Sequence, residues 1–143
     1  MPKATISADL APAPERIWEV LADLPRMPEW FAMHEKFVTE PPAAASAGAA
    51  FKQGVKIMGM PGDVEWTVET ADAPNRLEMS GKGPMGITLR TAFTVEASGT
   101  GSTVTCDMEF SGGMLAGPLG MSVQKEAAKN TEESLAKLGA LAA

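Results

Sequence analysis

The chain has 143 residues, 45% of them hydrophobic, and a formal net charge of −6. This length is typical of one domain, which we place at residues 1–143, and the negative charge disfavours binding to nucleic acid or anionic membranes, because both need clustered cations. With one cysteine, Cys106, and no apolar run near the ~20 residues of a membrane span, we expect a cytoplasmic protein without membrane insertion.

The N-terminal part is predicted to hold a strand followed by two short helices. Apolar and polar residues alternate over Lys3–Asp9, which is typical of a strand. Pro14 suits the first turn of a helix, and Glu15–Asp23 has the apolar spacing of an amphipathic helix. A second short helical turn is predicted from Pro28, and it carries the aromatic residues Trp30 and Phe31.

The middle of the chain is predicted to form an antiparallel sheet. A short strand at His34–Glu40 and a loop at Pro41–Ala50 precede five segments in which apolar and polar residues alternate. These segments cover residues 51–57, 64–69, 76–82, 85–95 and 103–110, with turn signals at 58–62, 73–75, 83–84 and 98–101. Short turns join antiparallel neighbours, so with the two N-terminal strands we expect about seven strands with one buried and one solvated face.

The side chains of the five segments separate by face. Every charged residue falls on one face, which is therefore predicted to be the solvated one. The opposite face is polar only at Gln53, Thr91 and Cys106. Its apolar members are Phe51, Val55, Ile57, Val64, Trp66, Val68, Leu77, Met79, Ile87, Leu89, Phe93, Val95, Val104, Met108 and Phe110.

The tail, Gly117–Ala143, is predicted to be one long helix that packs on this apolar face. Its buried stripe begins with small residues and ends among leucines, running through Gly120, Val123, Ala127, Thr131, Ser134 and Leu138. The small half should leave space against the bulky strand residues, which indicates a binding cavity. Methionines would give it an adaptable lining, namely Met79, Met85 and Met108. The alternative is an ordinary core in which these methionines fill gaps.

Few residues could carry chemistry. His34 is the only histidine, and it is either a group at the edge of the cavity or a surface or capping residue. Cys106 is interpreted as a small buried hydrophobe, because no histidine is placed by sequence to activate it. One histidine and one cysteine do not make a metal site. We therefore expect no metal, no cofactor and no catalytic residue beyond the candidate His34.

The order of these features resembles the START-like superfamily and, within it, the polyketide cyclase/dehydrase-like branch (SRPBCC). The resemblance rests on residues 11–23 (APAPERIWEVLAD) and 27–30 (MPEW), followed by the five alternating segments, which form a meander, and the C-terminal helix. It implies an α+β helix-grip fold, in which a curved antiparallel sheet wraps around the long helix with a hydrophobic cavity between them. Oxygenase members carry metal ligands that this chain lacks, and cyclase members place titratable groups in the pocket, where this chain has almost none.

We therefore expect a monomer or weak homodimer that binds or carries a lipid, polyketide, quinone-like or other hydrophobic small molecule. The ligand is expected to contact Trp30, Phe31, Phe51, Gln53, Val55, Trp66, Met79, Leu89, Thr91, Phe93, Met108, Phe110, Val123, Ala127 and Thr131. Two alternatives stay open. One is a cyclase or dehydratase that uses the same cavity, and the other is a protein-interaction module.

Overall fold

The computed structural model describes residues 3–57, 60–83, 86–112 and 118–143. In this part of the chain, seven strands form one antiparallel sheet in the order β1-β7-β6-β5-β4-β3-β2. The strands are β1 (Lys3–Leu10), β2 (His34–Phe37), β3 (Ala50–Ile57), β4 (Met60–Asp72), β5 (Arg76–Lys82), β6 (Thr88–Ser98) and β7 (Gly101–Ser111). The helices are α1 (Pro14–Leu21), the short 3₁₀-helix η1 (Leu24–Glu29) and α2 (Pro118–Ala142).

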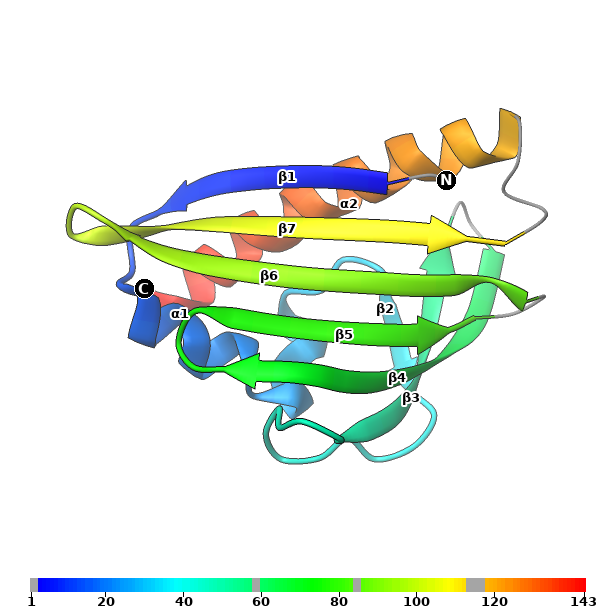
Figure 1. Ribbon diagram of the computed structural model, residues 1–143, viewed down its shortest axis with the longest axis horizontal. Coiled ribbons are helices and arrows are strands. Elements are labelled where there is room, and N and C mark those ends of the chain that lie inside the picture. Colours follow the sequence, from blue (N-terminus) through cyan, green and yellow to red (C-terminus); the bar gives the residue numbers. More distant parts are fainter. Residues whose placement is uncertain (1–2, 58–59, 84–85, 113–117) are drawn as a thin grey trace.

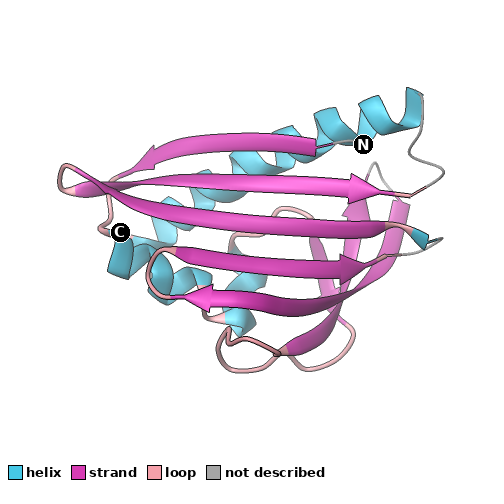
Figure 2. Ribbon diagram, viewed as in Figure 1, coloured by secondary structure: helices cyan, strands magenta, loops and turns pink. Residues whose placement is uncertain are grey.

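The predicted α+β helix-grip architecture is confirmed. The five-segment meander forms β3 to β7, and the N-terminal strand β1 pairs with β7 at the far edge of the sheet. The sheet curves around the side on which α2 lies (Figure 1). Helices α1, η1 and α2 lie on that side, and none of these three covers the opposite face of the sheet (Figure 2). The core therefore lies between the sheet and the helices.

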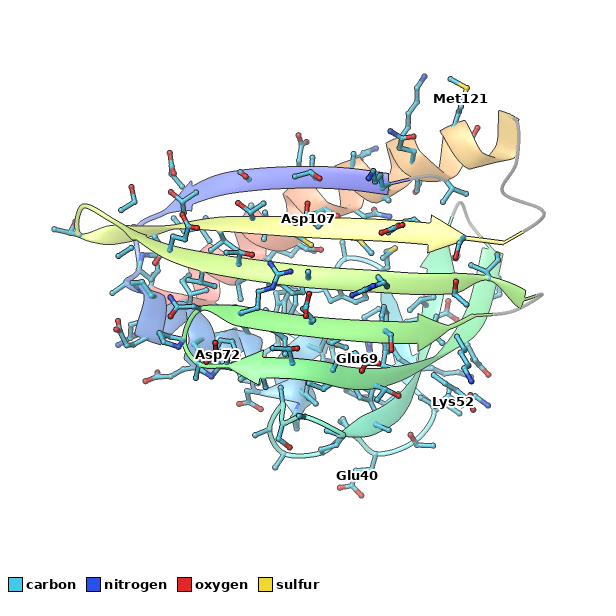
Figure 3. All side chains as sticks on the ribbon, viewed as in Figure 1. Glu40, Lys52, Glu69, Asp72, Asp107 and Met121 are labelled. Carbon is cyan, nitrogen blue, oxygen red and sulfur yellow. The ribbon has the colours of Figure 1, made fainter. Side chains whose placement is uncertain are left out.

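The predicted division of the sheet into two faces is also confirmed. Of the residues expected on the inner face, Ile87 is half-buried, the side chain of Ile57 lies outside the described part, and the others are buried. The charged side chains lie on the outer face, where Figure 3 labels Glu69 and Asp107. Because the side-chain period of a strand is two, this pattern sets the register of each strand against the core.

Helix α2 buries the predicted stripe. Gly120, Ala127 and Leu138 are buried with the rest of the stripe, and the charged residues of the helix are at least partly exposed. The helix packs mainly on β1 and α1. Arg16 of α1 ties down its end, because its Nε and Nη2 atoms donate hydrogen bonds to the carbonyl oxygens of Ala142 and Ala143, at 3.2 and 3.1 Å. Such contacts satisfy carbonyls that a helix end leaves without partners.

Two predicted element boundaries are wrong: the start of strand β4 and the start of the second short helix. Met60–Gly62 was expected in a turn but belongs to β4, where Pro61 pairs with Lys56 of β3. Strand β5 joins β4 only from Glu65 onward, so Pro61 needs no N–H for a second neighbour. Residues 58–59 of the same predicted turn lie outside the described part. The second short helix begins at Leu24 rather than at Pro28.

Strand β2 is shorter than predicted, and strand β6 is shifted toward the C-terminus, over Thr88–Ser98 instead of 85–95. Strand β2 ends at Phe37 instead of Glu40, because the register shifts after His34 and the N–H groups of Val38 and Thr39 both donate to the carbonyl of Lys52. Strand β6 starts at Thr88, after a turn that is closed by a 2.7 Å hydrogen bond from Gly83 N–H to the Ile87 carbonyl. The expected strand residue Met85, the turn residue Pro84 and the helix residue Gly117 lie outside the described part.

Candidate functional site

The residues predicted to contact a ligand lie together in the core between the sheet and the helices. Each of them exposes at most 7% of its surface, the largest value being that of Val123. The sheet contributes residues from β3 to β7, helix α2 contributes Val123, Ala127 and Thr131, and the segment after η1 contributes Trp30 and Phe31. Their contact with a ligand stays a prediction. Their low exposure means that a ligand must displace side chains in order to enter.

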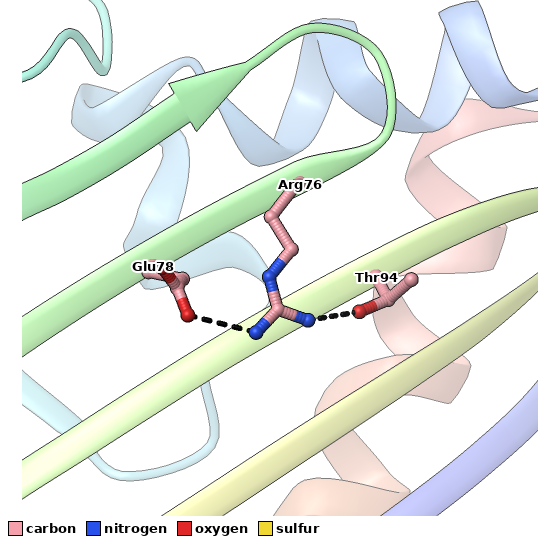
Figure 4. Close-up of polar contacts among 3 residues, drawn as sticks. All are labelled: Arg76, Glu78 and Thr94. Carbon is pink, nitrogen blue, oxygen red and sulfur yellow. Dashed lines mark hydrogen bonds and ion pairs between the residues drawn. The ribbon is translucent and has the colours of Figure 1, made fainter.

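Two hollows are lined by described residues, and both lie outside the space between the sheet and α2. One, of about 250 Å³, is on the outer face over β1, β5, β6 and β7. Its Arg76 donates hydrogen bonds to Glu78 (2.7 Å) and Thr94 (2.5 Å), as Figure 4 shows. The hydrogen bond from Arg76 lowers the pKa of Glu78. The other hollow, of about 290 Å³, lies at the edge formed by β2, β3 and β4, beside Gly54 and Gly62.

A chain of hydrogen bonds crosses the inner face from β4 to β2. The indole Nε1 of Trp66 donates to Gln53 Oε1 at 2.9 Å, and Gln53 Nε2 lies 2.8 Å from His34 Nδ1. Because an indole N–H only donates, the Gln53 carbonyl must face Trp66 and its amide must face His34. Gln53 therefore donates to His34 Nδ1. The ring proton of neutral His34 is then on Nε2.

His34 is half-buried at the start of β2, and this burial lowers its pKa. Its ring packs edge-on against Phe37, with 4.8 Å between the ring centroids. The partner Gln53 was identified in the sequence as a polar residue of the inner face, but its link to His34 was not. The link depends on the register shift in β2, which no local sequence pattern indicates.

Two polar atoms in the core have no hydrogen-bond partner among the described residues: Trp30 Nε1 and Thr91 Oγ1. The two side chains belong to residues that are 2% and 4% exposed. A buried polar group left without a partner costs about 1–3 kcal/mol, so such groups are rare unless they serve a purpose. The sequence marked both residues as ligand contacts, and it gave no sign that their polar atoms lack partners within the fold.

The other residues with reactive groups show no sign of a catalytic or metal-binding role in the described ranges. Cys106 is buried, as predicted, and burial with the nearby charge of Asp107 raises the pKa of its thiol, so it stays a neutral and weakly reactive group. Across the described ranges, no three His, Cys, Asp or Glu side chains gather closely enough to hold a metal ion. No helix in those ranges combines the length and apolar character that a membrane span requires.

Known proteins and a family model match this chain over nearly its whole length. The model of a family described as "Polyketide cyclase / dehydrase and lipid transport" matches residues 1–143. Two Mycobacterium tuberculosis proteins are similar over nearly their full lengths. Toxin Rv0910 is 30% identical over 135 residues, 94% of each chain, and uncharacterized protein Rv1546 is 29% identical over 141 residues, 99% of each chain. The crystal structure of TTHA0849 from Thermus thermophilus has the same fold, with a TM-score of 0.82, 20% identity, and 99% of this chain and 97% of that chain covered.

Proposed function

This chain belongs to the polyketide cyclase/dehydrase and lipid transport family, and on that basis we propose that it binds or carries a hydrophobic small molecule between the sheet and α2. The observation that carries the proposal is the character of the core: within the described ranges, none of the buried side chains is charged. An apolar lining with a few placed polar groups is typical of small-molecule sites.

The proposed ligand position is beside the small half of α2, because the buried side chains of this half are the smaller ones. Ala127 and Thr131 lie on the inner side of the helix, and Thr131 Oγ1 donates to the sulfur of Met108 on β7 at 3.2 Å. Methionine side chains are flexible and repack readily. Movement of Met108 would open space next to Thr131 without unfolding the sheet.

The test is to identify the small molecules that co-purify with the protein, using mass spectrometry after denaturation. We expect apolar molecules from the wild type and from the control Ala136→Phe, whose site is exposed on α2. Ala127→Phe should fold but release none, because the new ring occupies the ligand space. The proposal fails if the wild type carries nothing, if Ala127→Phe carries the same molecules, or if it unfolds, which would indicate a close-packed core.

A cyclase or dehydratase that uses the same space is the second candidate, and one observation favours it. Gln53 holds the ring of neutral His34 with the proton on Nε2, so His34 can donate a hydrogen bond to a substrate carbonyl. Turnover of a polyketide-type substrate should be lost in His34→Ala and kept in the exposed neighbour variant Glu35→Ala. Equal turnover in both variants would exclude a catalytic role for His34.

We also propose that the protein works in the cytoplasm as a monomer or weak homodimer and does not bind nucleic acid. The net charge of −6 supports the last point, because it repels phosphates.

A further inference from the structure

Among the described residues, the buried polar side-chain atoms of the core have hydrogen-bond partners within the chain, with two exceptions. Trp66, Gln53 and His34 bond to one another, and Ser134 Oγ accepts from Ala32 N–H at 2.9 Å while donating to the Asn130 carbonyl at 2.8 Å. Ser102 and Thr131 donate to Pro12 O and Met108 Sδ. Trp30 Nε1 and Thr91 Oγ1 alone are buried without a partner in the described part of the chain.

Both exceptions belong to residues that adjoin Phe93. The Trp30 ring packs edge-on against Phe93, with 5.7 Å between ring centroids. Phe93 follows Thr91 by two residues on β6, so both point inward and their Cα atoms are about 6.6 Å apart along the strand. Thr91 pairs with Met79 on β5 and with Met108 on β7. Thr91 therefore lies between two side chains that can move, and one of them, Met108, accepts a hydrogen bond from Thr131 of α2.

The chemistry of these two atoms defines what they can bind. An indole N–H only donates, and a hydroxyl group donates or accepts, so the group that they share must be an acceptor. The described core provides no cation for a carboxylate or phosphate and no anion for an amine, and an unpaired charge buried there is strongly unfavourable. An uncharged oxygen on an apolar body meets both conditions.

We propose that Trp30 and Thr91 form the polar anchor of the ligand site, and that the ligand is an uncharged apolar molecule with an oxygen atom that accepts hydrogen bonds. This oxygen accepts from Trp30 Nε1 and Thr91 Oγ1, while the apolar body of the ligand displaces Met79 and Met108. This inference rests on the proposed function, and it excludes free fatty acids and amines as ligands of this site.

Three naphthalene probes of similar size test the inference by equilibrium dialysis: 2-acetylnaphthalene, 2-ethylnaphthalene and 2-naphthoate. The affinity ratio of the ketone to the hydrocarbon is compared between wild type and variants, which cancels the different hydrophobicity of the probes. We expect Thr91→Val and Trp30→Phe each to lower this ratio roughly threefold to tenfold, the effect of one hydrogen bond. The matched controls Thr67→Val, on the outer face, and Trp18→Phe, on α1, should keep the wild-type ratio. Naphthoate should bind at least about tenfold more weakly than the ketone.

The outcomes separate the two proposals. If the neutral probes bind but the ratio is the same in Thr91→Val and Trp30→Phe as in the wild type, the anchor is wrong and the proposed function stands. Naphthoate that binds as tightly as the ketone overturns the restriction to uncharged ligands. If no probe binds, the proposed function fails and the anchor fails with it.

Thr91→Val also has a readout without ligand, because its melting temperature should equal or exceed that of the wild type. A clear fall would show that the hydroxyl already has a partner. Should Trp30→Phe not fold, Thr91→Val decides alone.

Discussion

At the scale of single residues, His34, Gln53 and Trp66 depend on one another for their orientation. Trp66 sets which way the Gln53 amide faces, and Gln53 sets which nitrogen of His34 carries the proton. Each such bond contributes about 0.5–1.5 kcal/mol net, and loss of the middle residue would leave a buried indole N–H without an acceptor. Gln53 is therefore a structural link between β2, β3 and β4, and it is less available to a ligand than Thr91.

The lowered pKa of His34 predicts a dependence of stability on pH. In the unfolded chain His34 titrates near its ordinary value of 6.5, and in the folded protein it titrates below this value because of burial. As the pH falls through 6.5 toward the folded pKa, the unfolded state takes up the proton first, so the free energy of unfolding decreases. Protonation at Nδ1 also breaks the bond from Gln53.

The measurement is urea unfolding of the wild type and of His34→Gln at about pH 7.5 and about pH 5.5, on either side of the histidine's ordinary pKa. The wild type should lose more stability between the two pH values than the variant, whose glutamine keeps an acceptor for Gln53 and does not titrate. Equal losses in the two proteins would show that His34 titrates alike in the folded and unfolded states.

At the scale of elements, α2 is built from two halves with different roles. Leu135 and Leu138 are fully buried in the second half, whereas the first half presents Val123 and Ala127 to the core. The end of the second half is further held to α1 by Arg16. The second half therefore anchors the helix, and the first half lies over the region proposed to admit a ligand.

This division predicts unequal costs for truncating leucines of α2. Leu138→Ala should lower the free energy of unfolding by about 2–5 kcal/mol, because it leaves a cavity in a fully packed part of the core. Leu141→Ala, at a half-buried position three residues later, should cost less than half as much. Urea titration of both variants decides the point. Similar costs would mean that the anchoring contacts are not concentrated at Leu138.

At the scale of the whole molecule, the N-terminal strand β1 contacts both β7 and the C-terminal helix α2. Strand β1 pairs with β7 along its full length, from Lys3 opposite Glu109 to Leu10 opposite Ser102, and α2 then packs on β1. The chain leaves β1 at the point where β7 begins. There Gly101 is so close to β1 and the residue after it that a Cβ atom would overlap the Leu10 carbonyl oxygen and lie 2.9 Å from that of Ala11.

Gly101→Ala should therefore destabilise the protein by about 1–3 kcal/mol, since the obstacle is backbone and cannot rotate away. The control Thr100→Ala changes an exposed residue of the preceding turn and should have little effect. Thermal unfolding followed by circular dichroism compares the two variants. An unchanged melting temperature in Gly101→Ala would show that β1 can shift away from β7 at no cost.

The amino-acid pattern alone was enough to predict where most strands lie, their two faces and the buried stripe of α2. These features follow from local periodicity, which a strand repeats every two residues and a helix every 3.6 residues. Phe51, Trp66 and Phe110 could thus be placed in the core, and Lys125 and Glu132 outside it, before any contact was known. The boundaries at Met60–Gly62 and at Thr88 could not, because they depend on where a neighbouring strand begins or a turn closes.

Which polar groups of the core find hydrogen-bond partners could be seen only in the folded chain. Gln53 and Thr91 looked alike in the sequence, as polar residues on an apolar face, yet Gln53 is bonded on both sides and Thr91 Oγ1 has no partner among the described residues. The difference arises because a hydrogen bond requires two atoms to meet within about 3 Å. Such a meeting depends on the register of strands and on the placement of Trp30 and His34 from another part of the chain, which periodicity does not encode.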